Sequence, residues 1–312
     1  MKNGAIALIG LGAIGVPIAD KLNSTYGEDF VLVASGARRE RLEKDKLFIN
    51  NNAFYPKVIS DKAEILKPIS LLIVCVKNYD LDTSLADIKQ VVSKETVILP
   101  LQNGIFSYEF FSKEFPKNTV LHGYVQGPNT RTENGNFYYK NAGVMHIGDS
   151  ADYSSGIADQ VYKKLSCAGV EVRVEANIRK MVGKKWMLNV AGNSVTALTG
   201  ADYSQFKNHI ALQNICRTCM QEFIRVAQRE AVELNAEDIE DIIKYYVSYI
   251  GDKKTSMLMD VLNARKTENE YLAGALLRKA GQYGLWLPVT STLYYLVKAK
   301  ESIYMENKEF WR

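Results

Sequence analysis

Three polar residues stand four positions apart in the second half of the chain: Lys185, Asn189 and Asn193. On a helix, a step of four residues rotates by only about 40°, so the three side chains would share one stripe. A protonated lysine can stabilise a developing negative charge and supply a proton, and amides suit carbonyl, carboxylate and hydroxyl groups. The neighbouring residues are apolar, and such polar groups are costly to bury unless a ligand meets them. The stripe is therefore either a solvated helix face or a candidate catalytic site.

A second pattern with chemical meaning is a glycine loop of the form G-x-G-x-x-G, which reads Gly10-Leu11-Gly12-Ala13-Ile14-Gly15. An apolar run that predicts a buried strand precedes it, and a helical pattern follows it. In this context the first glycine makes a tight turn, the second lets the backbone approach a pyrophosphate, and the third lets helix and strand pack closely. The free N–H groups at the start of the helix attract phosphates. The loop therefore predicts a dinucleotide-binding site.

The end of the second predicted strand should decide which nicotinamide cofactor is bound. NAD sites usually place an Asp or Glu there, about 20 residues after the loop. Here the strand continues into Ser35-Gly36-Ala37-Arg38-Arg39, without a carboxylate. Ser35 can hydrogen-bond a phosphate, and Arg38 or Arg39 can grip one with a bidentate fork, which favours NADP(H). The alternative is that both arginines lie on a solvated loop. Lys77 follows another predicted strand, at the sheet edge where such folds collect ligands.

Short runs rich in Val, Ile and Leu dominate the first half of the chain. They are typical of strands buried on both faces of a parallel sheet, and the stretches between them have helical character. The clearest runs are Ala5–Ile9, Phe30–Ala34, Leu71–Val76 and Val97–Leu99. We therefore expect an α/β fold with a Rossmann-type, doubly wound sheet. From about residue 121 alternating segments separated by turn signals predict an antiparallel extension, at Gly135–Lys140 and Val144–Ile147, and Val170–Val174 is the last predicted strand.

Helical periodicity replaces the strand signal after residue 177. The predicted helices are Met181–Leu198, Ile210–Glu233, Ala236–Gly251, Glu268–Gly281 and Val289–Asn307. We therefore expect a cofactor-binding domain at 1–176 and an all-helical substrate domain at 177–312. The junction lacks a Pro/Gly-rich linker, which predicts two packed domains with the active site in the cleft between them.

Composition limits the other function classes. The 312 residues are 47% hydrophobic and 24% charged, with a net charge of +4, as in an ordinary globular protein. No basic stripe is interleaved with aromatics, so we expect no nucleic-acid partner. No apolar run approaches the length of a membrane span or a signal peptide, so we expect a cytoplasmic protein. Cys216 and Cys219 form a Cys-x-x-Cys pair that lacks the second half of a zinc site, so no metal is predicted.

Ordered motifs along the chain carry a resemblance to the ketopantoate reductase (2-dehydropantoate 2-reductase) family over essentially its whole length. The motifs are the glycine loop, Val74-Cys75-Val76-Lys77, Gln102-Asn103-Gly104, the Lys185/Asn189/Asn193 helix with Thr196-Ala197, Ser256-Met257-Leu258-x-Asp260, and Thr267-Glu268-x-x-Tyr271-x-x-Gly274. Together, in this order and at compatible spacing, they are far more specific than any one of them.

The resemblance implies NADPH-dependent reduction of ketopantoate to pantoate, a step toward pantothenate and coenzyme A. It implies that Lys185 is the general acid and that Glu268 is its acidic partner. It also implies roles in binding, with Asn189, Asn193 and Ser256 holding the substrate, Asn103 near the nicotinamide and the reacting carbon, and Lys77 near the adenosine end of the cofactor.

Three questions stay open at this stage. The family often has Asn before the glycine of its last motif, whereas this chain has Ala273-Gly274, so another 2-oxo acid is an alternative substrate. A non-catalytic NADP(H)-binding sensor is an alternative of another class, although a sensor would need no proton donor in the stripe. Apolar helix faces in the second half could form a homodimer or belong to the core.

Overall fold

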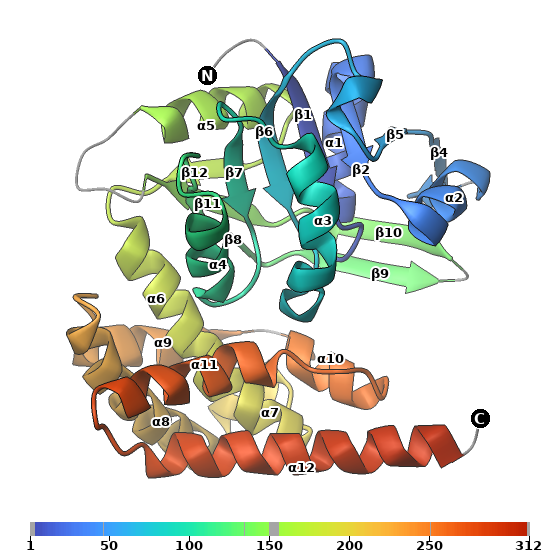
Figure 1. Ribbon diagram of the computed structural model, residues 1–312. Coiled ribbons are helices and arrows are strands. Elements are labelled where there is room, and N and C mark those ends of the chain that lie inside the picture. The colour runs from blue at the N-terminus through green and yellow to red at the C-terminus, as the bar shows by residue number, and fades with distance from the viewer. Residues whose placement is uncertain (1–3, 46, 134, 150–155, 250, 311–312) are drawn as a thin grey trace. The chain divides into compact units, whose positions relative to one another are not determined.

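The computed structural model describes residues 4–45, 47–133, 135–149, 156–249 and 251–310 (Figure 1). Its contacts divide the chain into two compact units, Met1–Arg179 and Lys180–Arg312. None of the described helices is both long enough and apolar enough to cross a membrane.

A five-stranded parallel sheet forms the centre of the first unit. Its order is β5-β2-β1-β6-β7, and its strands are β1 (Ala5–Ile9), β2 (Phe30–Val33), β5 (Lys57–Ile59), β6 (Ile69–Val74) and β7 (Val97–Pro100). Every residue of β1, β2, β6 and β7 is buried, which explains why these strands read as continuous apolar runs. The chain order reverses around β1, and ligands of such sheets bind at this switch point. The predicted Rossmann-type sheet is confirmed.

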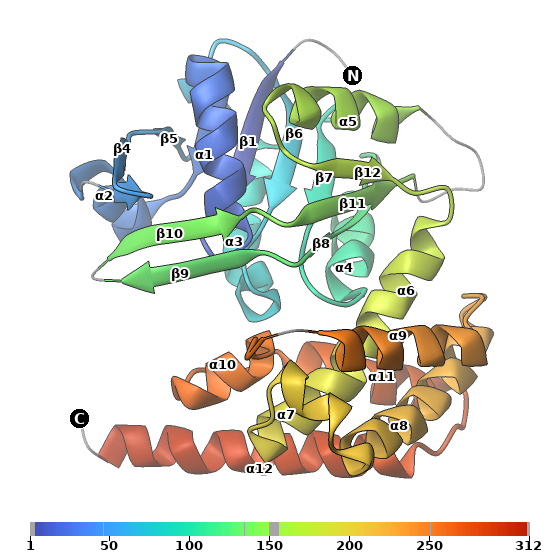
Figure 2. The same cartoon turned by 180° about the vertical axis from the view of Figure 1, so that it is seen from behind.

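Helices cover both faces of this sheet (Figures 1 and 2). Alternate residues of β1 face opposite ways, because Ile6 and Leu8 belong to one apolar cluster and Ala7 and Ile9 to another. The first cluster includes side chains of α1 (Gly15–Tyr26) and α5 (Ile157–Cys167), and the second includes those of α3 (Leu81–Val91) and α4 (Phe106–Glu114). The helix α2 (Gly36–Lys44) follows β2.

Two smaller sheets complete the first unit. One has the order β12-β11-β8 and the other β4-β3-β10-β9; their strands are β3 (Leu47–Ile49), β4 (Asn52–Phe54), β8 (His122–Gln126), β9 (Asn129–Glu133), β10 (Asn136–Asn141), β11 (Val144–Gly148) and β12 (Val172–Val174). The two strands predicted for an antiparallel extension, β10 and β11, belong to different sheets. Each pairs antiparallel with another strand, β10 with β9 and β11 with β8.

Every secondary-structure element assigned to the described residues of the second unit is a helix, as predicted. Its elements are α6 (Ile178–Leu188), the π-helical turn η4 (Asn189–Asn193), α7 (Ser194–Thr199), the 3₁₀ helix η5 (Tyr203–Lys207), α8 (Ile210–Arg229), α9 (Ala236–Ser248), α10 (Ser256–Leu262), α11 (Asn269–Gln282) and α12 (Pro288–Phe310). The predicted helix Met181–Leu198 is therefore two α-helices joined by a π turn.

Candidate functional site

The glycine loop after β1 has the backbone that a phosphate cradle needs. Gly10 has φ of +102°, a conformation that other residues rarely adopt. A Cβ at Gly15 would lie 1.9 Å from the carbonyl oxygen of Gly10, so α1 can start this close to the loop only with glycine there. A Cβ at Gly12 would meet no atom within 4 Å, so this side of the loop is open to a ligand. The loop could therefore hold a pyrophosphate against the start of α1.

The hairpin of β9 and β10 holds the loop and α1 by hydrogen bonds. The hydroxyl of Thr130 donates to the carbonyl oxygen of Ala13 at 2.7 Å. The hydroxyl of Tyr139 donates to the carboxylate of Asp20 in α1, also at 2.7 Å. Sequence analysis did not identify these residues, because they lie more than a hundred positions from the loop.

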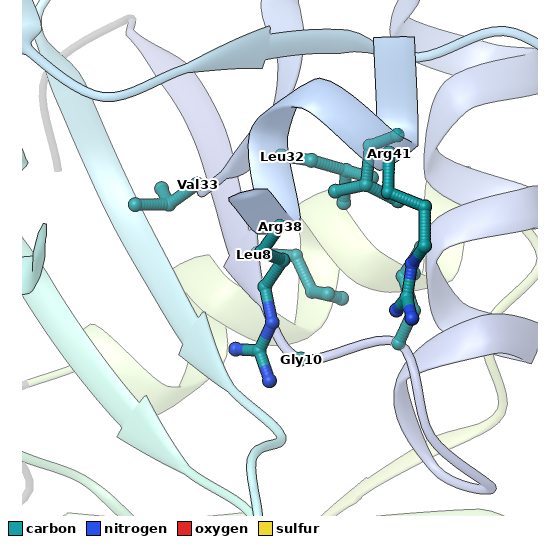
Figure 3. A pocket seen from close by; sticks show the side chains of 8 residues that line it. Leu8, Gly10, Leu32, Val33, Arg38 and Arg41 are labelled. Atoms are coloured by element: carbon teal, nitrogen blue, oxygen red, sulfur yellow. The ribbon is translucent and has the colours of Figure 1, made fainter. Parts of the chain in front are cut away.

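A pocket opens beside the loop, between the ends of β1 and β2 and the helix α2 (Figure 3). Its lining is apolar except for two arginines, and consists of Leu8, Gly10, Leu11, Leu32, Val33, Arg38, Arg41 and Leu42. The side chains of Arg38 and Arg41 extend from α2 toward Gly10. They are three residues apart on a helix and so share a face. No acidic side chain lines this pocket, and two exposed guanidinium groups make it a candidate phosphate site.

Arg39, by contrast, is held elsewhere by ion pairs. Its guanidinium lies 2.7 Å from the carboxylate of Glu43 and 2.9 Å from that of Glu64. Although desolvation raises the pKa of Glu64, hydrogen bonds from Arg39 and Ser60 lower it to about 2. Adjacent residues on a helix point about 100° apart, so Arg39 does not line the pocket that Arg38 lines. Ser35, the residue before α2, is exposed and does not line it either.

Two further predicted residues lie where β6 and β7 end. Lys77 and Asn103, both half-buried, follow these neighbouring parallel strands. Hydrogen bonds tie the two strand ends together: Asn78 donates to the carbonyl oxygen of Asn103 at 3.1 Å, and Gln102 donates to that of Val76 at 3.0 Å. The geometry therefore brings Lys77 and Asn103 to the carboxyl edge of the sheet, where ligands of this fold bind.

In the second unit, the predicted polar stripe crosses the π turn. Lys185 is half-buried in the last turn of α6, while Asn189 and Asn193 are the first and last residues of η4 and are only 4% and 3% exposed. A π turn contains more residues than the 3.6 of an α-helical turn. Four residues therefore rotate by less on the π turn than on a regular α-helix, and the π turn changes the angle between the two asparagine side chains. Such turns are frequent at functional sites.

The ammonium group of Lys185 is unusually acidic. Burial and the positive charge of Lys253 lower its pKa to about 8. Lys253 was missed by sequence analysis and lies on the segment before α10. Its carbonyl oxygen accepts a hydrogen bond from the N–H of Tyr203 at 3.1 Å, and its Nζ lies 6.0 Å from the centre of the Tyr249 ring. Two lysines in a partly buried place favour an anionic ligand.

The same segment is joined to the stripe helix through two threonines. The hydroxyls of Thr196 and Thr255 lie 2.7 Å apart, and both are buried. Thr255 also caps α10, since its hydroxyl accepts from the N–H of Leu258. Ser256 is the first residue of α10 and is exposed. The start of α10 is therefore fixed to α7, which is the helix that directly follows the π turn.

Glu268 is buried immediately before α11. α10 ends at Leu262 and α11 begins at Asn269, so Ser256 and Glu268 each stand at the beginning of a helix rather than on one straight helix. Ala273 is buried within α11, with 1% of its surface exposed. Among the described residues, no group of three or more His, Cys, Asp or Glu side chains could hold a metal ion, and the sulfhydryls of Cys216 and Cys219 are buried within α8.

Comparison with known proteins identifies the family. The family model "Ketopantoate reductase PanE/ApbA" matches residues 6–152, and the model of the C-terminal domain of the same family matches residues 177–301. A 2-dehydropantoate 2-reductase of Archaeoglobus fulgidus is 26% identical over 97% of this chain and 99% of its own length. An uncharacterized oxidoreductase, YkpB, of Bacillus subtilis is 27% identical over 92% of this chain and 95% of its own.

Solved structures share the fold of this chain. A D-mandelate dehydrogenase in complex with NADH and anilino(oxo)acetate has a TM-score of 0.84 and 25% identity, over 96% of this chain and 99% of that one. The fold also matches a 2-dehydropantoate 2-reductase from Methylococcus capsulatus, with a TM-score of 0.83, 23% identity, and coverage of 96% of this chain and 97% of that one. The chain therefore belongs to the ketopantoate reductase PanE/ApbA family of oxidoreductases.

Proposed function

We propose that this protein reduces the 2-oxo group of a small 2-oxo acid, with 2-dehydropantoate as the substrate and NADPH as the reductant. The observation that carries the proposal is the stripe of the second unit. It combines a lysine whose pKa is lowered to about 8 with two buried asparagines on the same helix face. A general acid is most effective when its pKa lies close to the working pH.

In this proposal, residues 1–176 bind the cofactor, which supplies a hydride when bound. The open side of the glycine loop holds the pyrophosphate. Arg38 and Arg41 hold the 2′-phosphate, and the lack of a carboxylate in their pocket favours NADPH over NADH. Lys77 and Asn103 contact the cofactor at the carboxyl edge of the sheet, in line with the family resemblance.

Residues 177–312 hold and protonate the substrate. As a carbonyl group is reduced, negative charge develops on its oxygen, and the ammonium of Lys185 stabilises this charge and then donates a proton to it. The amides of Asn189 and Asn193 and the hydroxyl of Ser256 hydrogen-bond the oxygen atoms of the substrate. Glu268 is the acidic partner in the site, by resemblance. Lys253 adds a second positive charge, which favours a substrate carboxylate.

A different 2-oxo acid is the second candidate substrate. Ala273 stands where the family often has Asn, which removes one polar group. The D-mandelate dehydrogenase of similar fold was solved with anilino(oxo)acetate, an aryl-substituted oxo acid. An apolar residue in place of an amide would suit an aromatic substituent better than the hydroxyl of 2-dehydropantoate.

Oxidation of NADPH, followed by its absorbance, tests these proposals. The protein is mixed with NADPH and, in turn, 2-dehydropantoate, phenylglyoxylate and pyruvate, and kcat/KM is compared between the three acids. We expect 2-dehydropantoate to be preferred; a higher kcat/KM for phenylglyoxylate supports the second candidate. NADPH binding without turnover of any acid would instead support a sensor and would contradict the proposed function.

Lys185→Ala tests the role of the lysine. We expect turnover to fall by roughly 10²–10⁴, the range for a lost general acid, with NADPH affinity unchanged. Lys185→Arg is the matched control, because it keeps the positive charge but does not release a proton near neutral pH. An arginine variant as slow as the alanine variant supports proton donation. A wild-type rate in Lys185→Ala would remove this residue from the site.

A further inference from the structure

The π turn that carries the two asparagines is in contact with a tyrosine from another helix. In a regular α-helix the carbonyl oxygen of Leu188 would accept from the N–H of Gly192, four residues on. In this chain the hydroxyl of Tyr246, from α9, donates to the Leu188 carbonyl oxygen at 2.8 Å, and Tyr246 is fully buried. A side chain inserted into the hydrogen-bond ladder is a known cause of local helix distortion.

Gly192 makes room for this hydroxyl. A Cβ at this position would lie 2.1 Å from the hydroxyl oxygen of Tyr246 and 2.7 Å from the ring carbon that bears it. No other residue type fits there without moving the tyrosine. Glycine is unfavourable in a helix interior relative to alanine, so the contact explains why glycine stands between the two asparagines.

Other contacts within the second unit hold Tyr246 in place. Its ring stacks on that of Tyr203 at 5.6 Å between centroids and lies 4.7 Å from that of Phe206. Asp238 is eight residues, or about two turns, earlier on α9, and its carboxylate accepts from Lys184 of α6 at 3.0 Å. The two helices are therefore joined at two successive places, by this ion pair and by the tyrosine hydroxyl.

We infer that Tyr246 is a positioning residue for the substrate-binding asparagines. Its hydroxyl, seated against Gly192, stabilises the π turn at Asn189–Asn193. The π turn in turn sets the angle between the two amides. The inference rests on the proposed function in one respect only, namely that Asn189 and Asn193 bind the 2-oxo acid. The shape of the turn itself does not depend on that proposal.

Tyr246→Phe is the test, because it removes the hydroxyl and keeps the ring packing. We expect the KM for the 2-oxo acid to rise about tenfold or more, since a small displacement of positioning groups has effects of up to a hundredfold. The KM for NADPH should stay unchanged. A crystal structure of the variant should show a regular α-helix through residues 189–193. Tyr245→Phe is the matched control, because it removes a hydroxyl from the adjacent residue, whose ring lies 6.1 Å from that of Tyr246.

The outcomes separate positioning from general stability. A variant that merely folds less well has fewer active molecules, so kcat falls while the KM for the 2-oxo acid stays constant; that result would overturn the inference. A retained π turn in the Tyr246→Phe crystal structure would overturn it as well. Asn189→Ala is measured alongside. If it leaves the KM for the 2-oxo acid unchanged, the proposed function fails, and the variant's crystal structure alone decides whether Tyr246 shapes the turn.

Discussion

The low pKa of Lys185 predicts how kcat/KM depends on pH. A neighbouring positive charge should influence this dependence. With a pKa of about 8, the ammonium is about ten parts protonated to one part neutral at pH 7 and the reverse at pH 9. A general acid works only while protonated, so kcat/KM for the 2-oxo acid should fall about tenfold per pH unit above pH 8. The ratio kcat/KM is the right quantity, because its pH dependence reports ionisations of the free enzyme.

The fall of kcat/KM above pH 8 is the alkaline limb of the pH profile. Lys253→Gln should move this limb to higher pH. Burial is the larger cause of the low pKa of Lys185, and the positive charge of Lys253 is the second. The substitution removes only the second cause. The pKa of Lys185 should therefore rise but stay below its ordinary value of 10.5. At about pH 9, the variant should retain a larger fraction of its own maximal kcat/KM than the wild type does.

Initial rates of NADPH oxidation from about pH 6 to about pH 10, at constant ionic strength, measure the shift. Lys254→Gln is the matched control, since it removes the same charge from the next residue, which is exposed. An unchanged limb in Lys253→Gln, or an equal shift in both variants, would refute the assignment of Lys253 as the charge that acts on Lys185. A limb that is absent from the wild type would refute the assignment of Lys185 as the acid.

Two further predictions concern the first unit. Arg38→Ala combined with Arg41→Ala should raise the KM for NADPH about ten- to hundredfold relative to that for NADH, because a charge-assisted phosphate contact is lost. Arg39→Ala is the control and should change neither KM, because Arg39 is ion-paired to two glutamates. An equal effect of all the substitutions would contradict the assignment of Arg38 and Arg41 to the phosphate. Burial and a nearby arginine lower the pKa of His122 in the folded protein to about 4. On acidification, the unfolded chain therefore binds a proton at this histidine before the folded protein does. The free energy of unfolding should fall by up to about 3 kcal/mol between about pH 6.5 and pH 4. Urea unfolding should show a smaller loss over that range in His122→Phe, which keeps an aromatic ring stacked on Tyr108, and an equal loss would exclude His122 as the cause.

Burial on both faces made the central sheet predictable. Four of its five strands are near-continuous apolar runs, and these four lie within two residues of the predicted bounds. The strands β3, β4, β5, β8 and β9 were not predicted because they are short and of mixed composition, which resembles that of loops. The helix α10, with seven residues, is too short for its periodicity to show. Local sequence patterns also did not predict which strands pair. β10 and β11 have similar patterns but belong to different sheets.

The candidate cofactor site was predictable in type but not in detail. The lack of a carboxylate after β2 was visible in the sequence, whereas the choice between Arg38 and Arg39 was not. That choice depends on Glu64, which lies 25 residues from Arg39 in the chain and holds its guanidinium. Arg41 could have been identified from its three-residue spacing to Arg38, once this segment was known to be a helix. Lys253 had no local signal, because its effect on Lys185 depends on how distant segments pack.

The polar stripe shows how local spacing can suggest the wrong helix geometry. The four-residue spacing of Lys185, Asn189 and Asn193 placed them together on an α-helix, and the structure has a π turn across the last two. One signal for this difference was present in the sequence. Gly192 is a helix breaker inside an otherwise strong helical pattern, and such a residue is retained where something needs the missing Cβ. What needs it is the Tyr246 hydroxyl, from a residue 58 positions beyond the carbonyl it contacts. The sequence could therefore locate the irregularity, but only the packing of α9 against it determines its shape.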